Sequence, residues 1–143
     1  MYCPFCSDAE TKVLESRLLN DSMRRRRECL KCSNRFTTYE KAVFNFSVIK
    51  KDSKEELFNL EKIRNSVKRA CGKIEDEDLN NLTRKIERRI LSKKKNHIKT
   101  EVIGKVVLNE LKNYNKIAYL RFASIHKSID DPKMFKKEIS QII

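Results

Sequence analysis

Four of the five cysteines fall in two matched pairs, Cys3-Pro4-Phe5-Cys6 and Cys29-Leu30-Lys31-Cys32, with 22 residues between the pairs. Each Cys-x-x-Cys pair can form a tight knuckle that presents two thiolates to one ion, and the span between the pairs suits a short β hairpin. The spacing predicts a closed, tetrahedral Zn²⁺ site with four ligands, Cys3, Cys6, Cys29 and Cys32. Metal binding would stand in for the hydrophobic core that such a small unit cannot build.

Two other uses of paired cysteines remain open, a disulfide framework and a redox dithiol. Structural disulfides are uncommon inside cells, and redox Cys-x-x-Cys motifs occur singly, at a strand-to-helix junction that this N-terminus lacks. The sequence has no apolar stretch behind a basic cluster at its start and no apolar run of membrane-spanning length. We therefore expect a soluble, cytoplasmic protein with no membrane partner. The fifth cysteine, Cys71, is expected to be a small buried hydrophobe.

The net charge of +13 favours a polyanionic partner, with nucleic acid or a nucleotide as the first candidate. Residues 1–44 hold only nine basic and six acidic residues, and their positive charge is concentrated in Arg24-Arg25-Arg26-Arg27. The arginine fork can donate two parallel hydrogen bonds to phosphate or to a guanine edge. In a strand, Arg24 and Arg26 would face one way and Arg25 and Arg27 the other. We expect two or three of them to contact nucleic acid while one packs over the sheet; a merely solvated charge run is the alternative.

The fold class is predicted to be α+β, with two domains. Strand-like runs at residues 11–18 and 35–40 flank the second knuckle, so residues 1–44 are expected to form a zinc ribbon. Residues 45–143 are expected to form a mainly helical domain. It begins with a short β hairpin, at residues 44–51 and 56–58, and four or five helices follow.

The predicted helices have apolar faces that repeat at helical spacing. The first three faces are Ile63, Val67, Ala70 and Cys71; Leu79, Leu82, Ile86 and Ile90; and Val102, Val106, Val107 and Leu111. Ile117, Leu120 and Ile125 are expected to form the face of the fourth helix. Asn59 and Thr100 are natural N-caps, and Asp131-Pro132 opens a last short helix. His97 and His126 are interpreted as surface or packing residues in helical context.

Glycine is nearly absent, because Gly72 and Gly104 are the only two in the chain. A Walker loop or a dinucleotide-binding fingerprint needs several glycines close together, so neither is present. A bound nucleotide would have to use side chains and helix N-termini. Lys50 and Lys51, at the end of a strand, together with Asn59 and Lys62, in the first turn of the next helix, could form such a triphosphate site. Surface lysines near helix starts are also common without any ligand.

Several motifs together resemble one family. They are C-P-F-C at the start, E-S-R at 15–17, R-R-R-R-E-C at 24–29, R-F-T-T-Y-E at 35–40, V-I-K-K-D at 48–52 and A-Y-L-R-F-A-S-I at 118–125. In this order, over residues 1 to about 139, they closely resemble the NrdR family. Members of that family are bacterial repressors of ribonucleotide reductase genes, built from a zinc ribbon and an ATP-cone domain.

The resemblance implies a DNA-binding ribbon coupled to a sensor of ATP and dATP, supported by Mg²⁺, that acts through changes of homo-oligomeric state in the ATP-cone. It implies no enzymatic activity. The implied nucleotide contacts are Val48 to adenine, Lys50 and Lys51 to base and phosphates, and Glu56, Asn59 and Lys62 to ribose and phosphates. Thr100 is similar to the threonine that begins a helix of the cone. Arg17, Arg24, Arg25, Arg26 and Arg27 are implied to contact double-stranded DNA.

Two serines depart from the family pattern, because Ser7 and Ser53 stand where glycine is usual. Each would cost about 1 kcal/mol if its backbone is left-handed. Rival functions are a zinc-ribbon protein that binds RNA or ribosomes, a dithiol oxidoreductase and a nucleotide hydrolase. No acidic pair, base or glycine loop is placed to activate water, so turnover of bound ATP is not expected.

Overall fold

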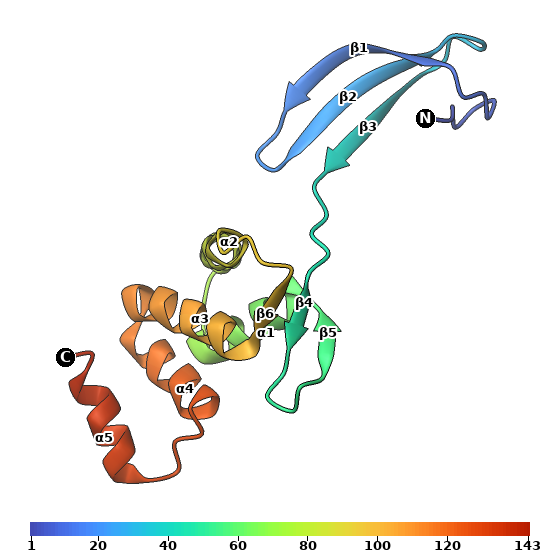
Figure 1. Cartoon of the computed structure of the whole chain (residues 1–143). Coiled ribbons are helices and arrows are strands. Elements are labelled where there is room, and N and C mark those ends of the chain that lie inside the picture. The colour runs from blue at the N-terminus through green and yellow to red at the C-terminus, as the bar shows by residue number, and fades with distance from the viewer. The chain divides into compact units, whose positions relative to one another are not determined.

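The computed structural model describes residues 1–143, which form two compact units, Met1–Phe44 and Asn45–Ile143 (Figure 1). The first unit is built from strands and the second mainly from helices, so the predicted α+β class is confirmed. None of the helices combines the length and the apolar composition that crossing a membrane requires.

The first unit is a single antiparallel sheet of three strands in the order β1-β2-β3. The strands are β1 (Thr11–Leu18), β2 (Ser22–Cys29) and β3 (Arg35–Lys41), so both predicted strands are confirmed. One irregularity, between Val13 and Glu15, interrupts the pairing of β1 with β2. The only buried residues in this unit are Cys3 and Cys29. The sheet therefore has almost no hydrophobic core of its own.

The second unit opens with the predicted hairpin, β4 (Ser47–Ile49) and β5 (Glu55–Leu57). A third strand, β6 (His97–Lys99), was not predicted from the sequence and pairs in parallel with β4. The helical context predicted for His97 is therefore wrong, because this residue lies on β6. Its Nδ1 is 2.5 Å from the Ser47 hydroxyl, and this contact joins β6 to the first residue of β4.

Five helices complete the second unit: α1 (Leu60–Cys71), α2 (Asp76–Leu91), α3 (Thr100–Tyr114), α4 (Lys116–His126) and α5 (Pro132–Ser140). Asn59 caps α1 as predicted, because its side chain accepts a hydrogen bond from the Glu61 backbone N–H at 2.9 Å. The N-cap prediction for Thr100 is wrong. Thr100 is the first residue of α3, and its hydroxyl donates to the Ile49 carbonyl at 3.0 Å. It thereby links the start of α3 to the end of β4.

The core of the second unit lies between the helices and the small sheet. The predicted faces of the first three helices point into it, with every predicted α2 residue buried. The predicted face of α4 is wrong at two of its three residues, because Ile117 is 57% exposed and Ile125 is 83% exposed, while Leu120 packs against the core. Ala118, Tyr119 and Ala123 are buried instead. Small residues on this face let α4 lie close to α1 and α3, with which it makes its main contacts.

Candidate functional site

The sulfur atoms of Cys3, Cys6, Cys29 and Cys32 all lie within 4.8 Å of one another. The Cys3 and Cys32 sulfurs are 3.7 Å apart, and those of Cys6 and Cys29 are 3.5 Å apart. These distances exceed the disulfide bond length of about 2.05 Å. They are close to the edge of about 3.8 Å in a tetrahedron whose Zn–S bonds are about 2.3 Å long. The four thiols therefore fit a Zn²⁺ ion.

The two knuckles share one backbone geometry. The Ser7 N–H donates to the Cys3 carbonyl at 2.9 Å, and the Ser33 N–H donates to the Cys29 carbonyl at 3.0 Å. Both serines have left-handed backbones, with φ of 60° at Ser7 and 57° at Ser33. The left-handed backbone considered for Ser7 is therefore present, and this φ is one that glycine adopts without strain.

One thiol of the cluster is set up to carry negative charge. The backbone N–H of Asn34, and then its side-chain amide, donate to the Cys32 sulfur and lower the pKa of Cys32 to about 6. The amide nitrogen lies 3.5 Å from that sulfur. Hydrogen bonds of this kind orient a metal ligand and stabilise its thiolate form.

Two arginines of β2 are held by neighbouring side chains. Arg27 donates to the Thr38 hydroxyl at 3.2 Å and to the Thr11 hydroxyl at 3.3 Å, so it spans all three strands. The Arg25 guanidinium lies 3.2 Å from the Glu40 carboxylate. These two side chains pack over the sheet, and they share one face because they are two residues apart in a strand.

The opposite face of β2 carries Arg24 and Arg26, whose side chains form no hydrogen bond or ion pair within the protein. In the strand register, Arg24 lies between Arg17 of β1 and Tyr39 of β3. Arg26 and Tyr39 are exposed, and Arg17 is ion-paired with Glu15. The sheet thus presents two unpaired guanidinium groups, flanked by a third arginine and an exposed phenol, on a single face.

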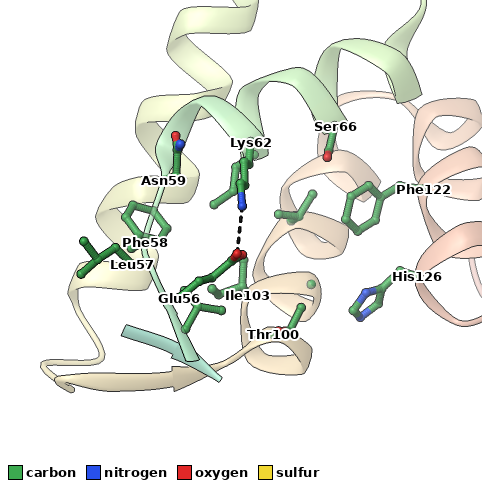
Figure 2. Close-up of a pocket in the computed structure, with 14 residues that line it drawn as sticks. Glu56, Leu57, Phe58, Asn59, Lys62, Ser66, Thr100, Ile103, Phe122 and His126 are labelled. Carbon is green, nitrogen blue, oxygen red and sulfur yellow. Dashed lines mark hydrogen bonds and ion pairs between the residues drawn. The ribbon is translucent and has the colours of Figure 1, made fainter. Parts of the chain in front are cut away.

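The second unit contains a pocket of about 180 Å³ (Figure 2). Cavities of about 150 Å³ with apolar walls hold a benzene molecule, so this pocket is large enough for an aromatic ring. Its apolar walls come from β4, from the end of β5 and the residue after it, and from α1, α3 and α4; they are Val48, Leu57, Phe58, Ile63, Ile103, Val107 and Phe122. Asn59, Lys62 and Glu56 supply polar groups at its edge.

Glu56 holds two lysines together at this edge. Its Oε2 lies 2.9 Å from the Nζ atoms of both Lys50 and Lys62. Lys50 first, and then Lys62, hold the pKa of Glu56 below its usual value, while Glu56 raises the pKa of Lys50. Two of the three lysines predicted for a phosphate site therefore meet at one carboxylate.

Lys51, the third lysine, lies in an adjoining hollow of about 180 Å³. This hollow is lined by the turn after β4 and the start of α3: Ile49, Lys50, Lys51, Ser53, Lys99, Thr100 and Glu101. Thr100 lines both spaces, so the apolar pocket and the basic hollow share one wall residue. Ser53 has φ of 65°, so the glycine-like backbone considered at this turn is also present. An apolar pocket beside a basic hollow suits a ligand with an aromatic ring and an anionic tail.

His126 lies at the end of α4 and is a packing residue, as predicted, but the sequence did not predict that its ring points into the pocket (Figure 2). The ring stacks on Phe122 with centroids 5.7 Å apart, and it lies against the backbone of Gly104. A Cβ atom at Gly104 would be 1.9 Å from the ring, so any other residue here would have to displace it. A lone glycine inside a predicted helix was the available signal for this close approach.

Comparison with known proteins accounts for both units. Residues 1–40 match the family described as "Transcriptional repressor NrdR-like, N-terminal domain", and residues 46–132 match the ATP cone domain. Proteins named "Transcriptional repressor NrdR" are 40% identical in Finegoldia magna and 39% identical in Clostridium acetobutylicum. These alignments cover 99% and 100% of this chain and 98% of each relative. The chain belongs to the NrdR family of transcriptional repressors.

Membership in the NrdR family confirms the resemblance seen in the sequence and places the chain among regulators rather than enzymes. The four-cysteine cluster lies inside the segment that matches the NrdR ribbon. The apolar pocket and the lysine edge lie inside the segment that matches the ATP cone.

Proposed function

We propose that the protein is a zinc-dependent repressor that binds operator DNA upstream of ribonucleotide reductase genes and responds to ATP and dATP. One observation carries the proposal. A single chain holds a four-thiol cluster, beside a sheet face with unpaired arginines, and a ring-sized pocket edged by lysines. The first arrangement suits double-stranded DNA and the second suits a nucleotide.

In the DNA-binding unit, one Zn²⁺ bound by Cys3, Cys6, Cys29 and Cys32 would fix both knuckles and hence the end of β2 at Cys29. Arg24 and Arg26, with Arg17 beside them, would donate to phosphate oxygens or to guanine edges. Arg25 and Arg27 would support that face from behind, because their guanidinium groups already have partners in the sheet. The family resemblance implied that five arginines contact DNA. In this proposal only three of them, Arg17, Arg24 and Arg26, do so directly.

In the nucleotide-binding unit, the base would enter the apolar pocket against Val48. The phosphates, with Mg²⁺, would lie toward Lys50, Lys51 and Lys62 and the N-terminus of α3 at Thr100. Phosphate oxygens would replace the Glu56 carboxylate as partner of Lys50 and Lys62. The released Glu56, with Asn59, could then accept hydrogen bonds from the ribose.

Nucleotide binding would change DNA affinity only if the nucleotide prefers one state of the protein over another. We propose that these states are homo-oligomers assembled through the ATP-cone unit, so that the arrangement of ribbons changes with the nucleotide bound. The protein would work in the cytoplasm, at the nucleoid when it is bound to DNA.

The test compares two double variants of matched charge. Arg24→Gln/Arg26→Gln should abolish the preference for a promoter duplex from the ribonucleotide reductase genes over a scrambled duplex. The control, Lys31→Gln/Lys41→Gln, removes two cations that are ion-paired to Asp8 and Asp21 and should keep that preference. Affinity for ATP should be equal in the wild type and in the two variants. Equal promoter preference in both variants would refute the assignment of the reading face.

A further inference from the structure

Most of the net positive charge lies in the second unit. Residues 45–143 hold 24 Lys and Arg against 14 Asp and Glu, a net charge of +10, whereas residues 1–44 have a net charge of +3. The proposed nucleotide site uses only three of these cations, Lys50, Lys51 and Lys62. Most of the excess charge therefore has no part in the function proposed above.

The excess is concentrated in the second half of α2 and the turn that follows it. Residues 84–95 include seven basic residues and one acidic residue, Glu87. Arg89 is paired with the buried Glu110 at 2.5 Å. The side chains of the other six cations are exposed and form no hydrogen bond or ion pair. We call these six residues the α2 basic strip: Arg84, Lys85, Arg88, Lys93, Lys94 and Lys95.

The strip lies on well-defined backbone. Arg84 and Arg88 are one turn apart on the side of α2 opposite the buried residues, such as Ile86. The turn with the three lysines is held by two bonds, from the Lys93 N–H to the Ile90 carbonyl at 3.1 Å and from the Lys94 N–H to the Leu91 carbonyl at 3.0 Å. The charges are therefore presented together by an ordered element.

Helix stability does not account for all of the strip. Cations near a helix C-terminus interact favourably with the helix dipole, but this effect is confined to about the last turn. Arg84 and Lys85 lie more than one turn before Leu91, where α2 ends. Like charges four residues apart, as in Arg84 and Arg88, repel each other and destabilise a helix. An anionic partner would remove this repulsion.

We propose that the α2 basic strip binds the phosphate backbone of DNA, in addition to the sequence-specific contacts of the first unit. This inference rests on the proposed function, because DNA is the polyanion that the first unit would bring to the same chain. Four of the six residues are lysines, which act as point charges on phosphate and do not read bases in the way an arginine fork can. A second, linked contact raises affinity through effective concentration and leaves sequence preference unchanged.

The experiment measures the salt dependence of binding by the full zinc-loaded chain to the promoter duplex and to a scrambled duplex of equal length. Two strip variants are compared, Arg84→Gln/Lys85→Gln/Arg88→Gln and Lys93→Gln/Lys94→Gln/Lys95→Gln. The matched control, Lys133→Gln/Lys136→Gln/Lys137→Gln, removes three exposed, unpaired cations from α5. Unchanged ATP affinity and solution mass establish that each variant is folded and assembled as the wild type is.

The slope of log affinity against log salt is negative, and each strip variant should reduce its magnitude by up to about 2.7 on both duplexes, at about 0.9 for each phosphate that the protein no longer neutralises. The preference for the promoter duplex should not change, and the control should match the wild type. Slopes equal to that of the control would overturn the proposal. So would a change of solution mass with unchanged duplex affinity. Binding of a single-stranded RNA of equal length is measured in parallel, and a loss confined to that RNA would also overturn the proposal. If the wild type shows no promoter preference, the proposed function fails, while the scrambled duplex still tests the strip.

Discussion

Between Met1 and Phe44 the only buried side chains are Cys3 and Cys29, whereas Asn45–Ile143 buries eighteen hydrophobic residues in one core. The first unit therefore depends on its metal site for stability, and the second depends on ordinary hydrophobic packing. The difference shows how one chain can join a metal-dependent domain to one that folds without the metal. Because the two units are stabilised differently, the proposed DNA binding and nucleotide binding can be lost separately.

Removing the metal should give the largest difference between the units. Structural Zn²⁺ sites contribute about 10–16 kcal/mol to folding at pH 7, and the first unit has no core to replace that contribution. Chelation, or the substitution Cys29→Ser, should abolish DNA binding, while helix content by circular dichroism and ATP affinity by calorimetry remain at wild-type values. Promoter binding by protein shown to be free of metal would contradict this prediction.

Crowding the pocket should affect only the second unit. In Gly104→Ala the new Cβ must displace the His126 ring, which is backed by Phe122. The displaced ring would occupy part of the pocket, and a ligand could enter only by forcing it back against the new Cβ. Overpacking of this kind costs about 1–3 kcal/mol, so ATP affinity should fall roughly tenfold. Alanine is the better helix former by about 1 kcal/mol, so a loss would come from the clash.

The matched control for this change is Lys105→Ala, the next residue of α3, whose side chain is exposed. It should leave ATP affinity unchanged, and both variants should keep full zinc content. Wild-type ATP affinity in Gly104→Ala would show that the position of the His126 ring does not matter for the ligand.

The smallest predicted effect is a pH dependence of the second unit. Burial, followed by Lys51 and Lys127, lowers the pKa of His126 below its usual 6.5, although Glu101 acts in the opposite direction. The unfolded chain therefore binds more protons than the folded chain just below pH 6.5. The stability that neutral His126 provides is complete above that pH and is lost as the pH falls toward the lowered pKa.

Urea unfolding of the zinc-loaded chain, followed by its helical signal, measures this effect. The free energy of unfolding should fall more steeply below pH 6.5 in the wild type than in His126→Phe. Parallel pH profiles of the two proteins would exclude His126 as the titrating group.

The sequence predicted those parts of the fold that have strong local signals. The cysteine spacing predicted the cluster, the apolar periodicity of α2 predicted its buried face, and Asn59 and Asp131 were predicted helix starts. In each case, residues close together in the sequence decide the local structure. The two Cys-x-x-Cys pairs are 22 residues apart, so the cluster is not a local structure. It could still be predicted, because one ion needs the ligands of both pairs.

Three features could not be predicted, because distant segments decide them. β6 has only three residues and becomes a strand through β4, about fifty positions earlier in the chain. α4 has apolar residues on more than one side, so packing rather than its own pattern selects Ala118 and Ala123 for burial. Which arginines of β2 are paired within the sheet depends on their partners on β3, because Arg27 bonds to Thr38 and Arg25 pairs with Glu40.

We propose that DNA binding and nucleotide binding are coupled through states of one protein. The most direct test measures the affinity of the full chain for ATP and for dATP, with and without promoter duplex. Linkage requires that DNA change the affinity for each nucleotide by the same factor by which that nucleotide changes the affinity for DNA. Lys50→Ala and Lys62→Ala should remove the response to nucleotide without preventing DNA binding. Equal factors in the two directions are the predicted result. Nucleotide affinities that do not change with DNA, while nucleotide still alters DNA affinity at equilibrium, would contradict the account.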